Sequence, residues 1–369
     1  MYIVLILFAV SILLSTGAVA LVLKISHRKG WYDHLDDRKI HSGNIPRMGG
    51  IGFTSAFLVI MVGVGIAYGI KGINIIRFLP CAAAMVITLF SGVYDDFRTM
   101  APRYKVLIQF AAALCVIIPG FTFEKLFYDG SGFLTNLGIW RYPVTILWVV
   151  GLTNAINLMD GVDGLAGGLC ALIVLFLGLI FFSFSGVSKS FFFCVCLLGV
   201  IIGFLAFNAP FPRAKIFMGD GGSQFLGLTL SLIPVMKDSL MDSSLPVFYA
   251  AALFAIPILD TTGAVWRRLR DGKKIYDPDK SHLHHKLLNL GLNARGVISV
   301  IFSLQIILGI LTFAAVRLEG IRSLLVLGAA YIIAPLFFTV IHYLNRNTVK
   351  KANMQNAPGN EISGPDASA

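Results

Sequence analysis

Long runs of apolar residues, separated by short polar segments, make up most of the chain. Each run is about 15–25 residues long, which is what an α-helix needs to cross a hydrocarbon core roughly 30 Å thick. The backbone finds no water there, so the runs are expected to be helices, and their unbroken apolar character excludes the alternating pattern of a barrel. The pattern predicts eleven spans: 2–23, 49–70, 78–94, 104–119, 142–158, 164–185, 190–207, 222–236, 246–266, 297–316 and 321–343.

Composition agrees with this pattern. Of the 369 residues, 57% are hydrophobic and 13% are charged, and the mean hydropathy is +0.81. A soluble domain keeps about a quarter of its residues charged, so the sequence indicates an all-α, polytopic integral membrane protein. The first span is expected to remain as a helix, because Lys24 and a basic loop follow it in place of a cleavage site. Residues 1–350 are expected to form one membrane domain, and 351–369 a disordered cytoplasmic tail.

The positions of lysine and arginine predict how the chain is oriented. Most of the 30 basic residues fall in the odd-numbered loops and the C-terminal segment, including the loop 267–296 that contains Lys280. This excess marks the cytoplasmic side, so the N-terminus is expected outside and the C-terminus inside. Because the same bias explains much of the net charge of +11, the charge does not point to a nucleic-acid partner. The five cysteines all fall within predicted spans and are interpreted as structural.

Five aspartates lie at or just inside the cytoplasmic edge of predicted spans: Asp95, Asp96, Asp160, Asp163 and Asp220. A lone Asp-Gly is usually a turn, and an Asp-Asp pair alone is often a solvated helix end. Taken together, however, carboxylates this close to hydrocarbon are costly unless they are paired or bind a cation. Oxygen ligands without a cysteine or histidine cage suit Mg²⁺, which uses one or two carboxylates together with substrate phosphates.

Glycines and basic residues accompany these aspartates. The stretches DGVDGLAGG and GDGGS open the sixth and eighth spans, where backbone N–H groups at a helix N-terminus can stabilise a phosphate. Six basic residues lie nearby in the sequence: Arg47, Arg98, Arg103, Lys105, Arg213 and Lys215. The combination predicts a site for diphosphate chemistry at the cytoplasmic face of a helical bundle.

A cluster of three histidines, His282, His284 and His285, lies in the last large loop. A zinc site is one interpretation, although the cluster lacks a convincing fourth ligand. Contact with a substrate phosphate, or a hydrogen-bond network that shapes the loop, is favoured over zinc.

Five segments in this order resemble the bacterial polyprenyl-phosphate N-acetylhexosamine-1-phosphate transferases: RKIHSGNIPRMGG, the Asp95-Asp96 pair, NAINLMDGVDGLAGG, KIFMGDGGS and SHLHHK. The resemblance covers about residues 30–290. IPRMGG and HLHHK look like the WecA/TagO branch rather than the TPTMGG-like and HHHxE patterns of the MraY translocases, in which an acidic residue stands at the position of Lys286. Eleven spans also fit that branch, since ten are expected for the translocases.

The resemblance implies an enzyme that takes UDP-N-acetylhexosamine, with UDP-GlcNAc preferred, and undecaprenyl phosphate. It would release UMP with Mg²⁺ or Mn²⁺ as cofactor, at the cytoplasmic face of the cell membrane, as the first lipid-linked step of a cell-envelope glycan. It implies Asn157 and Asp220 as metal ligands. Its catalytic residues would be Asp95, Asp96, Lys105 and Asp163. Its substrate-binding residues would be Arg47, Asn154, Asp160, Phe217, His282, His284 and His285.

Alternatives remain open at this stage. A translocase that takes UDP-MurNAc-pentapeptide is the nearest one, and a membrane ion transporter represents a different class. Transporters usually place ionisable residues near the middle of the membrane on broken helices, whereas here even Asp260 lies near a predicted cytoplasmic end. The sequence also leaves open a one-step or a covalent two-step reaction, the identity of the hexosamine, and a homodimer.

Overall fold

The structure is a computed structural model that describes residues 2–32, 45–67, 75–127, 136–209, 213–236, 244–277, 279 and 281–355. These residues form thirteen α-helices and two short 3₁₀ helices, and apart from two isolated bridges they contain no β-structure. The elements are α1 (Tyr2–Lys29), α2 (Gly49–Ala67), α3 (Ile75–Phe97), α4 (Pro102–Ile117), η1 (Gly138–Trp140), α5 (Arg141–Met159), α6 (Leu165–Ser185), α7 (Lys189–Asn208), α8 (Gly219–Leu232), η2 (Ile233–Val235), α9 (Val247–Leu253), α10 (Ala255–Arg270), α11 (Leu283–Asn289), α12 (Ala294–Arg317) and α13 (Gly320–Gln355).

All eleven predicted spans coincide with helices, and the expectation of an all-α, multi-pass membrane protein is confirmed. Within the described residues, eight helices are long and apolar enough to cross a membrane, and a ninth is added if α9 and α10 count as one broken span. Helices α4 and α8 have only 16 and 14 residues, so they fall short of a full crossing by themselves. The number of true crossings and the orientation of the termini therefore stay predictions.

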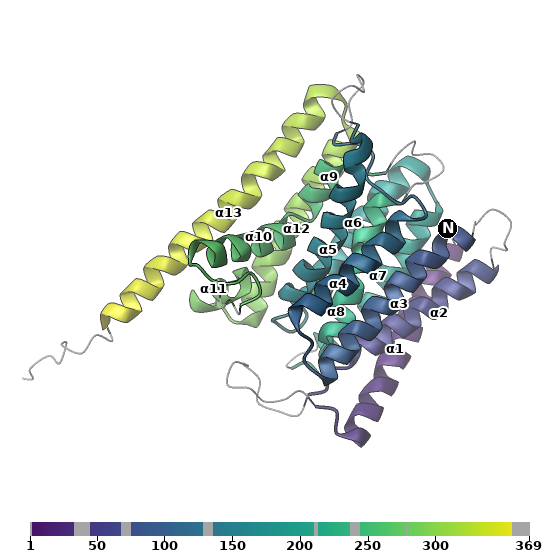
Figure 1. Ribbon diagram of the computed structural model, residues 1–369, viewed down its shortest axis with the longest axis horizontal. Coiled ribbons are helices and arrows are strands. Elements are labelled where there is room, and N and C mark those ends of the chain that lie inside the picture. Colours follow the sequence, from purple (N-terminus) through teal and green to yellow (C-terminus); the bar gives the residue numbers. More distant parts are fainter. Residues whose placement is uncertain are drawn as a thin grey trace, which may run out of the picture.

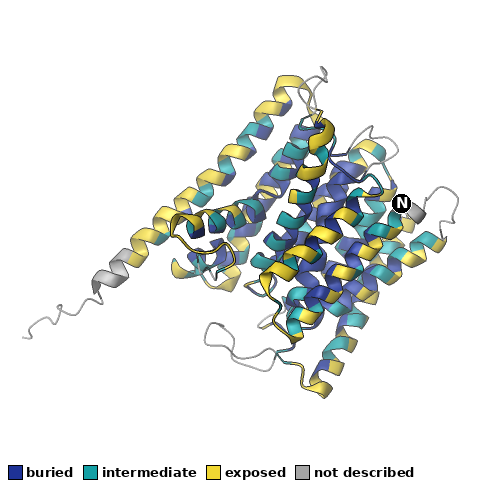
Figure 2. Cartoon of the chain, viewed as in Figure 1, coloured by how far each residue is buried: buried dark blue, intermediate teal, exposed yellow. Residues whose placement is uncertain are grey.

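Helix α8 lies at the centre of the bundle, where it packs against α2, α3 and α5 (Figures 1 and 2). Glycines make this close packing possible. A Cβ atom at Gly92 of α3 would lie 2.6 Å from the Cα of Gly221, and one at Gly227 would lie 2.6 Å from the Cα of Thr153 on α5. Because apolar burial drives little association between helices in lipid, such small-residue contacts are a main source of packing energy. They hold α8 between α3, which contacts its N-terminus, and α5, which contacts its middle.

The ninth predicted span is broken into α9 and α10, which meet at 86°. Pro257 explains the break: it has no N–H group to donate to the carbonyl of Leu253, four residues earlier, and its ring clashes with that carbonyl. The side chain of Gln305 on α12 satisfies the freed group, with its Nε2 3.0 Å from the Leu253 oxygen. The sequence pattern had predicted one continuous helix here, because Pro257 lies inside an otherwise uniform apolar run.

Several of the loops predicted to share one side of the membrane meet at one end of the bundle, which we call the site end. The backbone N–H of Gly49 donates to the carbonyl of Phe217 (2.9 Å), and that of Gly164 donates to the Asn208 side chain (2.9 Å). Helix α13 runs along the outside of the bundle (Figure 1) and continues to Gln355. The first residues of the predicted tail are therefore helical, and residues 356–369 lie outside the described part.

Candidate functional site

Asp220, in the first turn of α8, is the centre of a polar cluster at the site end. Its Oδ1 accepts a hydrogen bond from the Asn157 side chain of α5 (3.2 Å), and its Oδ2 accepts one from Lys105 of α4 (3.2 Å). The guanidinium of Arg47 lies 3.7 Å from Oδ1. Three residues that the resemblance selected from separate parts of the chain, Asn157, Lys105 and Arg47, are thus brought together around the carboxylate of a fourth, Asp220.

Lys105 also contacts Asp95, so its ammonium group bridges two carboxylates. The other oxygen of Asp95 accepts a hydrogen bond from the backbone N–H of Met100 (2.6 Å), which holds the turn between α3 and α4. The side chain of Asp95 is 7% exposed, against 23% for Lys105 and 21% for Asp220. Solvent and ligands therefore reach this cluster through Lys105 and Asp220 rather than through Asp95.

Asp96 is turned toward the N-terminus of α8. Its two carboxylate oxygens accept hydrogen bonds from the backbone N–H groups of Asp220 (2.9 Å) and Gly221 (3.0 Å), and Arg47 lies 3.6 Å from it. The idea that the GDGGS terminus offers free N–H groups to a phosphate is therefore wrong for these two groups. The sequence could not show this, because the competing acceptor comes from a different helix. A carboxylate at this position satisfies and stabilises the helix terminus.

Two polar residues of this region had not been selected from the sequence. Ser223 accepts a hydrogen bond from Asn157 (2.8 Å) and donates to the carbonyl of Gly219 (3.1 Å), so it fixes Asn157 beside Asp220. Gln109 of α4 forms two hydrogen bonds with the side chain of Asn154 on α5. A polar side chain inside an apolar span was the available signal for Gln109, since such groups seek partners in a membrane.

The DGVDG loop joins α5 to α6. Asp160 ends α5 with φ −80° and ψ 55°, and Gly164 precedes α6 in the left-handed region with φ 77°, a conformation that favours glycine. Burial, and then the nearby charge of Asp220, raises the pKa of Asp160 to about 7. The charge of Asp163 acts in the same direction. Asp160 thus lies within electrostatic reach of Asp220, and Asp163 lies within reach of Asp160.

The first histidine of the cluster is held by a residue of the broken span. Asp260 of α10 lies 2.8 Å from the Nδ1 of His282 and accepts a hydrogen bond from the backbone N–H of Leu283 (2.7 Å), at the start of α11. His282 is 4% exposed and Asp260 is 3% exposed. His282 therefore serves to place the segment. Asp260 had been noted only as lying near a cytoplasmic end.

The second histidine connects α11 to the DGVDG loop. The ring of His284 covers Gly161 so closely that a Cβ there would lie 2.8 Å from its Cε1 atom, which explains the glycine. His284 is buried, its Nδ1 has no hydrogen-bond partner, and burial lowers its pKa to about 4. His285 is half-buried, whereas Lys286 is buried. No group of three or more His, Cys, Asp or Glu in the described residues is arranged to hold a metal, so the zinc interpretation is not supported.

Phe217, which the resemblance implies as a substrate-binding residue that could stack on uracil, lies just before α8. Its backbone N–H donates to the carbonyl of Pro46 (2.8 Å), and its carbonyl accepts from Gly49. The side chain is half-buried at the site end. The structure thus ties the residues before α2 to the segment that carries Asp220, and the stacking role stays a prediction.

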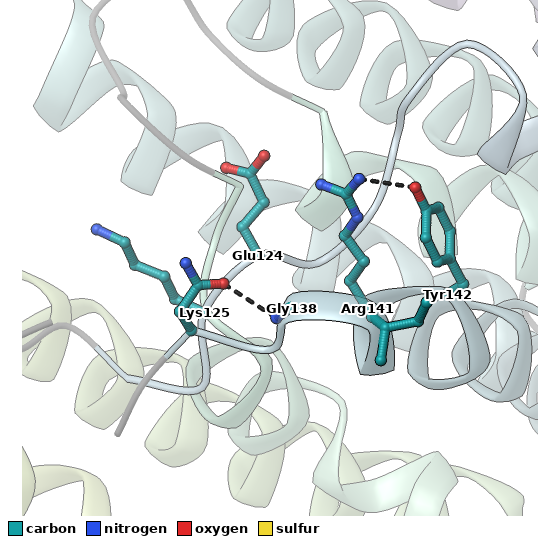
Figure 3. A pocket seen from close by; sticks show the side chains of 7 residues that line it. Glu124, Lys125, Gly138, Arg141 and Tyr142 are labelled. Atoms are coloured by element: carbon teal, nitrogen blue, oxygen red, sulfur yellow. Dashed lines mark hydrogen bonds between the residues drawn. The ribbon is translucent and has the colours of Figure 1, made fainter. Parts of the chain in front are cut away.

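A pocket lies at the opposite end of the bundle (Figure 3). It is lined by Glu124, Lys125, Asn136, Gly138, Ile139, Arg141 and Tyr142. Helix α5 begins at this pocket and ends at Asp160, and its 19 residues at a rise of 1.5 Å separate the two ends by about 28 Å. None of the predicted site residues lines this pocket.

Comparison with known proteins agrees with the geometry. The profile of glycosyl transferase family 4 matches residues 78–237, a segment that contains Asp95, Lys105, Asn157 and Asp220. The chain is 35% identical, over 310 residues, to a probable undecaprenyl-phosphate N-acetylglucosaminyl 1-phosphate transferase of Bacillus subtilis (strain 168), with 82% of each chain covered. It is 30% identical, over 284 residues, to the undecaprenyl-phosphate alpha-N-acetylglucosaminyl 1-phosphate transferase of Escherichia coli (strain K12), covering 74% of this chain and 73% of the relative.

A third relative, the undecaprenyl-phosphate alpha-N-acetylglucosaminyl 1-phosphate transferase of Yersinia pestis, is 28% identical over 331 residues, or 88% of each chain. The similarity therefore covers most of the chain, and the profile match includes Asp95, Lys105, Asn157 and Asp220. The chain belongs to glycosyl transferase family 4.

Proposed function

We propose that the protein transfers GlcNAc 1-phosphate from UDP-GlcNAc to undecaprenyl phosphate, giving undecaprenyl-diphospho-GlcNAc and UMP. The observation that carries the proposal is the cluster in which Lys105 and Arg47 surround the carboxylate of Asp220 at the end of a membrane bundle. The names of the relatives support the same donor sugar and the same lipid acceptor.

The reaction brings two polyanions together, so charge neutralisation and alignment are its main requirements. An oxygen of the lipid phosphate forms a bond to the β-phosphorus of the nucleotide sugar. The bond from that phosphorus to the bridging oxygen breaks, and UMP leaves with the electron pair. Lys105 and Arg47 supply positive charge beside the path of the transferred phosphoryl group. A phosphate monoester with a second pKa near 6 is mostly ionised at neutral pH, so Asp95 would orient it through Lys105 rather than deprotonate it.

The donor set around Asp220 fits Mg²⁺, with Mn²⁺ as a substitute. Asp220 provides carboxylate oxygens. The Asn157 side chain beside it provides an amide oxygen when its terminal amide is rotated by about 180°, so that Oδ1 replaces Nδ2 next to Asp220. Because Mg²⁺ binds through one or two carboxylates and substrate phosphates, it does not need a preformed group of three acidic ligands. When bound, the ion would neutralise the diphosphate. Asp220 and Asn157 would hold it.

The neighbouring loops would receive the nucleotide sugar. Asp160 lies within electrostatic reach of Asp220, Asp163 follows it in the same loop, and Phe217 precedes Asp220 in the chain. Among the three clustered histidines, only His285 has an accessible side chain, and we assign sugar or phosphate contact to it. His282 and His284 would act by holding the segment against the DGVDG loop, because both are buried and the ring of His284 covers Gly161.

The protein would lie in the cell membrane with its site end facing the cytoplasm. The distribution of basic residues supports this orientation, since the loops that meet at the site end carry most of the lysines and arginines. The nucleotide donor is a cytoplasmic metabolite by its chemistry, and the acceptor lipid lies in the surrounding bilayer. A homodimer is compatible with the apolar outer faces of helices such as α13.

The test is a product assay with purified protein in a lipid bilayer, given undecaprenyl phosphate, Mg²⁺ and one nucleotide sugar at a time. UDP-GlcNAc should yield UMP and a lipid-linked sugar, and UDP-MurNAc-pentapeptide should yield neither. Reversed selectivity would move the protein to the translocase branch, and no product from any UDP-N-acetylhexosamine would refute the proposal. Asp271→Asn, at an exposed ion pair with Arg270, is the control for charge removal.

A further inference from the structure

Gln109 and Asn154 form a reciprocal pair of hydrogen bonds between α4 and α5. The Nε2 of Gln109 donates to the Oδ1 of Asn154 (3.3 Å), and the Nδ2 of Asn154 donates to the Oε1 of Gln109 (2.5 Å). Asn154 also donates to the carbonyl of Val150 (2.8 Å), and Gln109 is 2% exposed. Since an Asn side chain has two N–H donors and one carbonyl, every group of this amide is already used within the protein.

The pair lies one helical turn from the two donors on Asp220. Lys105 and Gln109 are four residues apart on α4, and residues at this spacing share a face of a helix. Asn154 is three residues before Asn157 on α5, again on one face. Each helix thus contributes one amide to the pair and, a turn away, one donor to the same carboxylate.

The buried apolar side chains of α4 do little by themselves to fix how far it slides along α5. The buried residues of α4 other than Gln109 are Ala112, Ala113 and Val116, which are small and apolar. Apolar side chains of similar size accept several helix registers, whereas a buried polar pair selects one. A shift of α4 along its axis would carry the Lys105 ammonium away from Asp220.

We infer that the Gln109–Asn154 pair is a positioning device that sets Lys105 between Asp95 and Asp220, and that Asn154 acts through Lys105 rather than by touching the nucleotide. This assignment replaces the nucleotide-binding role that the family resemblance gave to Asn154. It rests on the proposed function for the role of Lys105 in turnover, but the geometry itself can be tested without turnover.

The kinetic test compares Gln109→Ala, Asn154→Ala, the double variant, and the exchange Gln109→Asn with Asn154→Gln. Each single variant should lower kcat about tenfold, the effect of about 1.4 kcal/mol, and leave KM for UDP-GlcNAc within about twofold. The double variant should be no worse than either single one, because the two residues act as a unit. The exchange keeps a reciprocal amide pair and should restore most of kcat. A rise in KM confined to the Asn154 variants, without rescue by the exchange, would overturn the inference.

A second readout does not depend on activity. Modification of Lys105 by an amine-reactive reagent, followed by mass spectrometry, should speed up several-fold in the single variants and return toward the wild-type rate in the exchange. Unchanged Lys105 reactivity in folded single variants would also refute the inference. If the alanine variants do not fold, Gln109→Leu supplies a near-isosteric apolar replacement, and Thr153→Val, which loses only an intrahelical bond, is the control. Failure of wild-type protein to make lipid-linked product would refute the proposed function and leave this readout valid.

Discussion

The side chain of Asp96 bonds the backbone of Asp220 rather than its side chain. A carboxylate oxygen of Asp96 accepts the N–H of Asp220 at 2.9 Å, and the other accepts the N–H of Gly221. The two carboxylates therefore have different tasks although both lie in the same cluster. Asp96 fixes the end of α8, and that helix end presents the Asp220 side chain to Asn157 and Lys105.

Replacement of Asp96 by alanine should therefore destabilise the fold as well as reduce activity. Loss of a helix-capping side chain typically costs about 1 kcal/mol, and unsatisfied buried N–H groups add roughly 1–3 kcal/mol. The unfolding temperature of Asp96→Ala in detergent should drop by several degrees relative to wild-type protein. Asp271→Asn should unfold like the wild type. An unchanged unfolding temperature with lost activity would instead assign Asp96 directly to the substrates.

Asp220→Asn should give the opposite result. The substitution keeps the shape of the side chain and removes the anionic ligand, so UMP release should fall by about 10²–10³-fold while the unfolding temperature changes little. Titration with Mg²⁺ should show a higher concentration for half-maximal residual activity. Near-normal turnover in this variant would remove Asp220 from the metal site.

Asp260→Ala should loosen the histidine segment, because it removes the acceptor for both His282 and the backbone N–H of Leu283. Donor binding should weaken and KM for UDP-GlcNAc should rise by about tenfold, since the segment borders the loop that carries Asp160. Asp260→Asn keeps one acceptor for Leu283 and should be less impaired. Equal KM values in both variants and the wild type would show that the segment does not border the donor.

His284 should make the fold less stable as the pH falls. Burial lowers the pKa of His284 from 6.5 to about 4, so the unfolded chain binds a proton more readily than the folded one between these values. The contribution of His284 to the free energy of unfolding is complete above pH 6.5 and is lost as the pH falls toward 4. At pH 5 the loss is roughly 2 kcal/mol. On going from pH 7.5 to pH 5, the unfolding temperature of His284→Gln should therefore fall less, or rise more, than that of the wild type. The exposed His27→Gln is the control and should leave the difference unchanged.

The orientation can be tested by cysteine labelling in intact cells. Lys280 lies outside the described residues, but the exposed Lys273 belongs to the same loop, and the exposed Asn136 lies at the opposite end. An impermeant thiol reagent should label Asn136→Cys from outside and should reach Lys273→Cys only after the membrane is opened. Four of the five native cysteines are buried and the fifth is half-buried, so the background should be low. Labelling of Lys273→Cys in intact cells would reverse the topology.

Much of the fold and of the cluster could be predicted from the sequence. An apolar run of sufficient length predicts a membrane helix without knowledge of its neighbours. Carboxylates beside hydrocarbon are costly unless they are paired or bind a cation, so Asp95, Asp160 and Asp220 could be selected from the sequence. What the sequence could not predict is which group faces which. The resemblance implied a catalytic role for Asp96. The sequence could not show that its side chain bonds the terminus of α8, because Asp220 lies 124 positions further along the chain.

The sequence likewise could not show which side chains pair with buried amides, or which group compensates for a break in a helix. Asn154 and Gln109 are 45 positions apart, and only their packing shows that they satisfy each other. The bend between α9 and α10 follows from Pro257, yet it is tolerated because Gln305 arrives from α12 to bond the freed carbonyl. Local sequence gives the cause in each case, whereas the compensating partner comes from tertiary structure.

The short central helix also has a consequence for how the protein is made. With 14 residues, α8 is about 21 Å long, less than the roughly 30 Å of a hydrocarbon core, and its first turn holds three glycines. The free energy gained when such a segment enters the lipid without neighbouring helices is therefore small. It can settle only against neighbours such as α2, α3 and α5, which the ribosome has already produced when α8 emerges. Substitutions on the faces of α3 and α5 that receive α8 should therefore reduce the amount of protein that survives biosynthesis, before any effect on turnover can be measured.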